Sequence, residues 1–149
     1  METFEETHIL NAFSNSMVGC AYLDGKLLFR VTMHEEPDFP VYALADLKNP
    51  QFEQIDLSIG IALEQTKQRP LQATEKPGEY YIAVSNYLDT PFEDNCSVGR
   101  FNVHDLSFEP MLTLEGIVLN NDATWVDAEN KMIYSAYEGK LVEFSYTDP

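Results

Sequence analysis

Residues 18–32 read VGCAYLDGKLLFRVT, and this stretch has the pattern of a β-hairpin. Two runs rich in branched and aromatic residues flank Asp24-Gly25, a dipeptide that supplies the positive φ angles of a tight turn. The pattern therefore predicts two antiparallel strands, over Val18–Leu23 and Lys26–Thr32.

Similar short runs follow along the chain, with turn residues between them. They predict strands over Val41–Asp46, Phe52–Leu57, Tyr80–Tyr87, Val98–His104, Met111–Leu114, Ile117–Leu119, Ala123–Asp127, Met132–Tyr137 and Leu141–Tyr146. Helical signal is scarce, because Pro70 and Pro77-Gly78 would soon end a short helix over Glu64–Arg69. We expect one long surface loop around residues 65–79. The whole pattern predicts an all-β fold, built as an antiparallel meander of hairpins.

The length of the chain, 149 residues, fits a single all-β domain over residues 1–149. Aromatic residues make up 12% of the chain, which argues against disorder, because disordered chains contain few of them. Glu2, Glu5 and Glu6 stand where a secretory signal would carry Lys or Arg. No stretch approaches the roughly 18 apolar residues of a membrane span. We expect a cytoplasmic protein, with the removal of a leader as the alternative.

The charge of the chain is strongly negative. Nine Lys and Arg residues stand against 25 Asp and Glu residues, which gives a formal net charge of −16. Such a field repels nucleic acid and anionic membrane surfaces, so we expect neither as a partner. Two explanations remain. The charge keeps the protein in solution, or it attracts a strongly basic protein partner and speeds their association.

Recognisable catalytic motifs are absent from the sequence. It has no GxSxG elbow, no HExxH, no Walker loop and no dinucleotide fingerprint. Cys20 and Cys96 match no metal or redox spacing, so free thiols are expected, with a single disulfide as the alternative. Cys96 and His104 would lie too far apart along one strand to form a nucleophilic pair. We expect no enzyme activity and no cofactor. A hydrolase built from dispersed residues is a weaker alternative.

Two parts of the sequence have the residue types of a metal site without its spacing. His34-Glu35-Glu36-Pro37-Asp38 is the one dense group around a histidine, and we interpret it as a solvated acidic loop. Asn120–Asp122 and Asp127–Asn130 offer oxygen ligands, but the regular spacing of a calcium loop is missing. Asn and Asp side chains commonly cap their own backbone in turns, and we favour that interpretation.

Aromatic residues fall into two groups. Trp125, Tyr134, Tyr137 and Phe144 are expected in the core, since alternate strand positions are buried. Other aromatics lie in loops among carboxylates, where they would grip Lys and Arg side chains by packing, charge and cation–π contact. The candidate partner-binding residues are Glu35, Glu36, Asp38, Phe39, Tyr87, Asp89, Phe92, Glu93 and Asp94. The alternative is that Phe39 and Phe92 close the ends of a sheet.

In size, acidity and lack of catalytic motifs, the chain resembles the immunity proteins that bacteria pair with the toxins they use in competition. Those that neutralise nucleases are often acidic, because a nuclease must be basic to bind nucleic acid. The resemblance rests on composition and carries over no residues. It implies an inhibitor whose carboxylates cover the basic active-site groove of a nuclease-type toxin.

A weaker resemblance lies in the C-terminal third. Trp125-Val126-Asp127, Ile133-Tyr134 and Gly139-Lys140-Leu141 are similar to the strands and turn of a β-propeller blade. A faint repeat, Asp46-Leu47 with Pro50 and Asp105-Leu106 with Pro110, with a degraded copy at Tyr146–Pro149, would give three such blades. Three blades cannot close a ring, since propellers use roughly four to eight. A sandwich of hairpins, an open partial propeller, or a homodimer acting as a propeller-like scaffold or ligand-binding module would all fit. We favour the sandwich.

Overall fold

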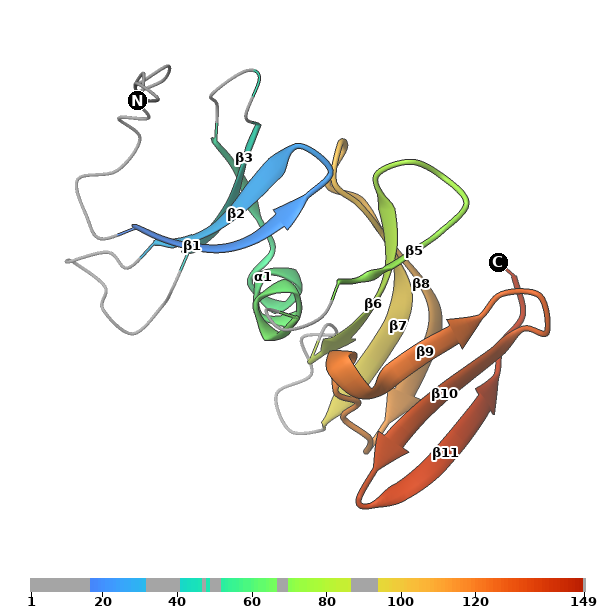
Figure 1. Cartoon of the computed structure of the whole chain (residues 1–149). Helices are drawn as coiled ribbons and strands as arrows, with labels where there is room; N and C mark the ends of the chain where they lie inside the picture. The colour runs from blue at the N-terminus through green and yellow to red at the C-terminus, as the bar shows by residue number, and fades with distance from the viewer. Residues whose placement is uncertain are drawn as a thin grey trace, which may run out of the picture.

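The computed structural model describes residues 17–31, 41–46, 48, 52–66, 70–86 and 94–148. Strands dominate these ranges and form three antiparallel sheets (Figure 1). The first sheet contains β1 (Met17–Leu23), β2 (Lys26–Val31), β3 (Val41–Asp46) and β4 (Phe52–Ile55). The second contains β5 (Gln72–Ala73), β6 (Glu79–Ser85), β7 (Asn95–Asn102) and β8 (Phe108–Glu115). The third contains β9 (Thr124–Asp127), β10 (Met132–Tyr137) and β11 (Lys140–Ser145), and the helices are α1 (Leu57–Gln65) and the 3-10 helix η1 (Asn121–Ala123).

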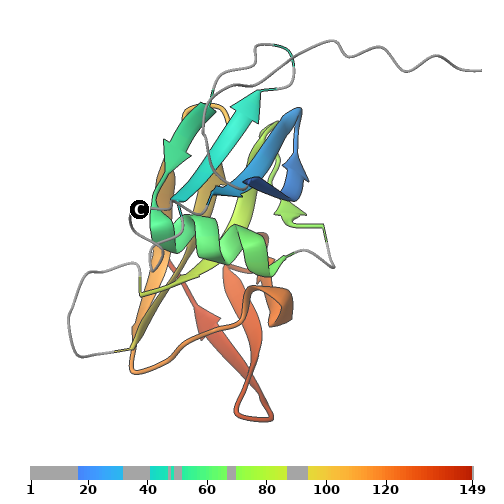
Figure 2. The ribbon, with the colours of Figure 1, turned by 90° about the vertical axis from the view of Figure 1, so that its left-hand side faces the viewer.

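Each sheet is a meander, in which strands that follow one another along the chain are hydrogen-bonded neighbours. This topology confirms the predicted all-β meander of hairpins. The three sheets also follow one another in space, and α1 lies between the first and the second (Figures 1 and 2). Within the described ranges, none of the helices has both the length and the apolar character needed to pass through a bilayer.

The hairpin formed by β1 and β2 confirms the turn predicted at Asp24-Gly25. Both residues have positive φ angles, 42° and 85°, as a tight two-residue turn requires. The two strands pair antiparallel from Leu23 opposite Lys26 to Met17 opposite Val31. The turn sets the register as far as Ala21 opposite Leu28, and the register shifts between Gly19 and Ala21.

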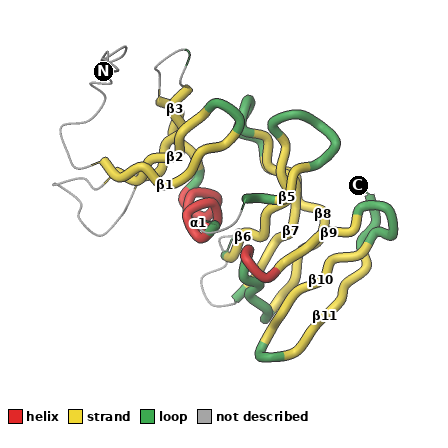
Figure 3. The backbone as a smooth tube through the Cα atoms, viewed as in Figure 1, coloured by secondary structure: helices red, strands yellow, loops and turns green. Residues whose placement is uncertain are grey.

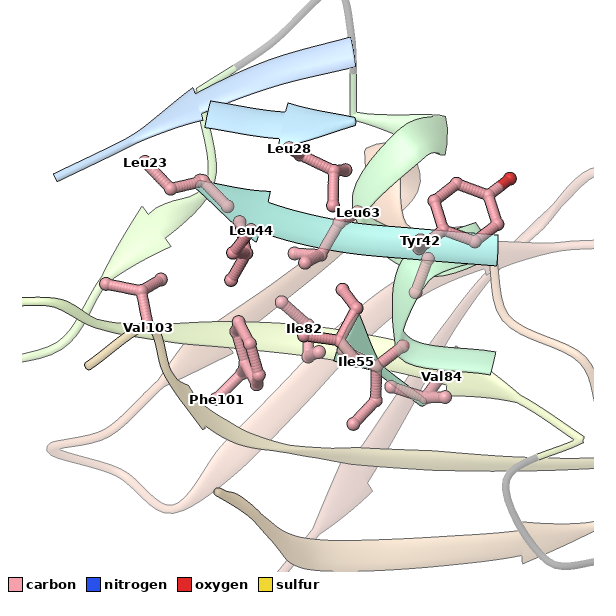
Figure 4. Packing of buried hydrophobic residues seen from close by; sticks show 12 residues of the cluster. Leu23, Leu28, Tyr42, Leu44, Ile55, Leu63, Ile82, Val84, Phe101 and Val103 are labelled. Atoms are coloured by element: carbon pink, nitrogen blue, oxygen red, sulfur yellow. The ribbon is translucent and has the colours of Figure 1, made fainter. Parts of the chain in front are cut away.

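The first core fills the space between the first sheet, α1 and the second sheet. Leu28 and Leu44 point from the first sheet toward Ile82 and Phe101 of the second, with Leu63 of α1 beside them (Figure 4). All five side chains are fully buried. Burial of each contributes about 1.5–3 kcal/mol, so this core is the main link between the two sheets.

The second core lies between the second and third sheets. Its buried residues include Val98 of β7, Val126 of β9 and Ile133 of β10. The second sheet is therefore covered on both faces, and five consecutive residues of β7, from Asn95 to Gly99, are buried. A strand covered on both faces reads as a continuous run rather than an alternation. Beyond this run the burial alternates: Phe101 and Val103 are buried, whereas Arg100 and Asn102 are partly exposed and His104 is exposed.

The predicted strand over Phe52–Leu57 is wrong at its end, because β4 stops at Ile55 and α1 starts at Leu57. Asp56 caps the helix, since its side chain accepts hydrogen bonds from the backbone N–H groups of Ser58 and Ile59. Within α1, a Cβ at Gly60 would overlap the ring of Tyr42, so glycine allows the helix to approach β3 closely.

Two further differences lie in and beside the second sheet. The strand predicted over Met111–Leu114 lies within β8, which runs from Phe108 to Glu115. The strand predicted over Ile117–Leu119 is wrong, because residues 117–119 are outside any strand. Pro110 is accommodated within β8 opposite Gly99, where the register with β7 shifts. The long loop predicted around residues 65–79 contains the short strand β5.

Candidate functional site

Most of the partner-binding residues predicted from the sequence lie outside the described ranges. These are Glu35, Glu36, Asp38, Phe39, Tyr87, Asp89, Phe92 and Glu93. Asp94 is described, and it is exposed immediately before β7. Its backbone carbonyl accepts a hydrogen bond from the N–H of Gly116 at 2.7 Å. The proposed contacts of the two acidic loops therefore stay predictions.

The described surface does contain the combination of aromatic and acidic side chains, on the third sheet. Val126, Ile133 and Phe144 of this sheet face the second core. Because side chains alternate along a strand, their neighbours point away from the core. We call this side of the sheet the outer face, and its residues are Trp125, Asp127, Met132, Tyr134, Ala136, Leu141, Glu143 and Ser145.

One row of the outer face crosses all three strands. Tyr134 on β10 stands opposite Trp125 on β9 and opposite Glu143 on β11. The side chain of Trp125 is 59% exposed, and that of Leu141 is 81% exposed. Cross-strand aromatic neighbours stabilise a sheet, and the exposed ring of Trp125 also offers apolar surface to a partner.

The expectation that Trp125 belongs to the core is wrong. Trp125 and Val126 are consecutive on one strand, so they must face opposite sides, and Val126 takes the core side at 3% exposure. The same parity leaves Tyr134 half-buried on the outer face, whereas Tyr137 and Phe144 pack against the second core as expected. The third sheet is the last of the stack, and only one of its faces is covered by the described chain.

The charges around the outer face are mainly negative. Asn130 donates hydrogen bonds to Asp127 from its backbone and its side chain, and these bonds hold the pKa of the Asp127 carboxyl below its usual range. Asp127 is therefore ionised at neutral pH. Glu143 is exposed beside the aromatic row. The nearby cation Lys131 forms an ion pair with Asp148 near the C-terminal end of the chain.

A partly open pocket lies where β9 meets the edge of the second sheet. It has a volume of about 160 Å³. Its walls are apolar at Leu71, Ile82 and Val126 and aromatic at Tyr81 and Trp125, and Asp122 is among its polar lining residues. Figure 3 shows η1, which contains Asp122, at the start of β9 and beside β6. Trp125 thus belongs both to the outer face and to the pocket.

Two amide side chains hold the walls of the pocket together. Gln72 on β5 bonds to both backbone groups of Val126: its Nε2 donates to the carbonyl at 2.6 Å, and its Oε1 accepts from the N–H at 2.9 Å. Asn121 accepts from the N–H of Ala83 at 3.0 Å and donates to the carbonyl of Ala62 at 3.2 Å. These bonds join the second sheet to the third sheet and to α1, so the pocket has a fixed shape.

The other groups considered from the sequence have structural partners. Asn120 accepts a hydrogen bond from the backbone N–H of Asp122, as Asp127 does from Asn130, which agrees with turn-capping roles. Cys96 is fully buried in the second core, and burial raises the pKa of its thiol. His104 is exposed and lies 3.0 Å from Asp24, so Cys96 and His104 are not brought together.

Comparisons with known proteins find no match. No family model matches the chain, and neither a curated protein nor a solved structure is similar enough to be matched to it. The function has to be argued from geometry and charge. Chemically, an exposed tryptophan with a half-buried tyrosine beside it and carboxylates nearby can bind apolar and cationic groups of another molecule.

Proposed function

We propose that the chain is an acidic protein-binding module whose outer face receives a basic protein and inhibits it. The observation that supports the proposal is the row of Trp125, Tyr134 and Glu143 on a sheet face left uncovered by the described chain. Trp and Tyr dominate binding energy at protein interfaces, because they bury much apolar area with little loss of conformational freedom.

The net charge of −16 supports a basic partner rather than an acidic one. A complementary field raises the rate of encounter, and the aromatic row then contributes the short-range energy. A nuclease-type toxin fits this description, because its active-site groove must be basic to hold nucleic acid. An immunity protein that covers such a groove excludes the substrate by charge and by bulk.

The partner to test first is the product of the gene next to the gene of this chain, which the proposal expects to be a basic protein. Titration calorimetry should give a one-to-one complex that weakens as salt is raised, and the chain should suppress nuclease activity of that protein at equal concentration. The inhibitor proposal is overturned if the neighbouring product is not basic, if it does not bind, or if it stays active in the complex.

Two matched pairs of variants place the interface. Trp125→Ala should weaken binding by about 30-fold or more, whereas Tyr22→Ala, which removes a 65% exposed aromatic from β1, should leave it unchanged. Glu143→Lys should weaken binding and reduce its salt dependence more than Glu75→Lys, which reverses an exposed charge outside the third sheet. Equal effects within either pair would move the interface away from the outer face.

A second candidate function is a scaffold that acts as a homodimer. The strand order of the third sheet is β11-β10-β9, so in the described part of the chain β11 is an edge strand. An open edge can pair with a strand of a second copy. Two chains of charge −16 repel each other, which favours the basic partner instead. Light scattering of the purified chain decides between the two candidate functions, since a stable dimer would support the scaffold.

A further inference from the structure

The pocket beside Trp125 has features of a binding site for one particular side chain. Leu71, Ile82 and Val126 offer an apolar wall, and the rings of Tyr81 and Trp125 stand at its lining. A cavity of about 150 Å³ is large enough for a benzene-sized group, so about 160 Å³ can hold one long side chain. Because Trp125 is also exposed on the outer face, a partner bound there would lie next to the pocket.

The polar groups that line the pocket are largely engaged within the protein. Gln72 and Asn121 use their amide oxygens and nitrogens in the bonds that join the sheets and α1. The hydroxyl of Thr66 donates to the carbonyl of Leu63, and that of Thr124 donates to the carbonyl of Asn120. A neutral polar ligand would have to compete with these bonds. The lining therefore favours a ligand recognised by its apolar stem and its charge.

The sign of that charge is positive. Asp122 contributes a carboxylate, and no Lys, Arg or His is among the described residues that line the pocket. Arg100 hydrogen-bonds to the side chain of Tyr81, but its guanidinium is paired with Glu109 and Asp148. Tyr81 and Trp125 are also among the lining residues, and an aromatic ring attracts a cation placed above its face.

We propose that this pocket binds an arginine side chain of the basic partner, so the inference rests on the proposed function. The aliphatic stem lies along Leu71 and Val126, and the guanidinium stacks on Trp125 near Asp122. Arginine suits the site better than lysine, because its planar, weakly hydrated head stacks on aromatic rings. The walls are already fixed by Gln72 and Asn121, so little order has to be gained on binding.

The test uses the full chain and two small probes, N-acetyl-arginine amide and its neutral isostere N-acetyl-citrulline amide. Trp125 is the one tryptophan of the chain, so its fluorescence reports directly on the pocket. Arginine amide should change the emission of Trp125 saturably, with a dissociation constant of about a millimolar. Citrulline amide should bind about threefold to tenfold more weakly, because it lacks the charge.

Variants separate the charge of Asp122 from the charge of the whole protein. Asp122→Asn should weaken binding of arginine amide about threefold to tenfold and leave citrulline amide unaffected. Glu75→Gln, which removes an exposed carboxylate away from the pocket, should change neither probe. If Asp122→Asn fails to fold, binding of the two probes to the parent chain still shows whether the pocket prefers the charged one. Equal binding of the two probes, or no saturable change with arginine amide, overturns the proposal.

The two proposals can fail separately. If a basic partner protects the outer face but arginine amide does not bind, the pocket assignment is wrong and the proposed function stands. If arginine amide binds the pocket but no basic protein is inhibited, the pocket is a cation site and the inhibitor function is wrong.

Discussion

Replacing Gln72 with alanine should loosen the join between the second and third sheets. The substitution removes two hydrogen bonds to Val126, of 2.6 and 2.9 Å, and leaves both backbone groups of a largely buried residue without their partner. A hydrogen bond contributes about 0.5–1.5 kcal/mol net, so the two together contribute about 1–3 kcal/mol. For a chain of this length, a loss of about 2 kcal/mol lowers the melting temperature by about 4–8 °C.

Urea unfolding measures this loss, followed both by Trp125 fluorescence and by circular dichroism. Gln54→Ala is the matched control, because Gln54 is exposed on β4, and it should change the free energy of unfolding by less than about 0.5 kcal/mol. If the two variants lose the same stability, the bonds from Gln72 do not hold the sheets together. The pocket would then lack the fixed walls that these bonds supply.

Three other expectations concern the backbone, the pH dependence and the buried thiol. Gly99→Ala should lower the free energy of unfolding by about 1–3 kcal/mol or more, since a Cβ there would overlap the carbonyl oxygen of Glu109. Gly116→Ala meets open space and should lower it by only about 1 kcal/mol, because of the positive φ of Gly116. Thermal unfolding of both variants checks this order. The low pKa of Asp127 in the folded state means that its stabilisation is complete above about pH 5 and is lost as the pH falls below about 4. The difference in unfolding free energy between the parent chain and Asp127→Ala should shrink over that acidic range, and a difference independent of pH would contradict it. In a Cys20→Ser variant, Cys96 should react with a thiol reagent far more slowly in buffer than in concentrated urea. The reason is that burial excludes the reagent and raises the pKa of the thiol. Equal rates in the two solutions would place Cys96 outside the core.

The parts of the fold that could be predicted from sequence are those specified by neighbouring residues. Asp24-Gly25 sets the first hairpin, and the strands Val41–Asp46 and Met132–Tyr137 have the predicted bounds. α1 was harder to predict, because its apolar run Ile59–Leu63 resembles a strand and contains a glycine. The one local sign of its start is Asp56, a residue type that commonly caps helices. The short helix considered over Glu64–Arg69 overlaps only the last two residues of α1.

The candidate site depends on where a sheet lies in the stack, which a single strand does not specify. Alternation places Trp125 and Val126 on opposite faces, but it does not say which face is covered. Only the packing of the third sheet against the second places Val126 inside. The bonds from Gln72 to Val126 join positions 54 residues apart, so no local pattern could indicate them. Of the acidic loop residues proposed from sequence, Asp94 is the one that lies within the described ranges, and the proposed contacts stay predictions.

Hydrogen–deuterium exchange of the chain, alone and with the product of the neighbouring gene, tests the central claim most directly. If the outer face is the interface, amides of β9–β11 should exchange more slowly in the complex, and those of the β1–β2 hairpin should be unchanged. Protection confined to Met17–Val31, with exchange in Thr124–Ser145 unaltered, would contradict the account.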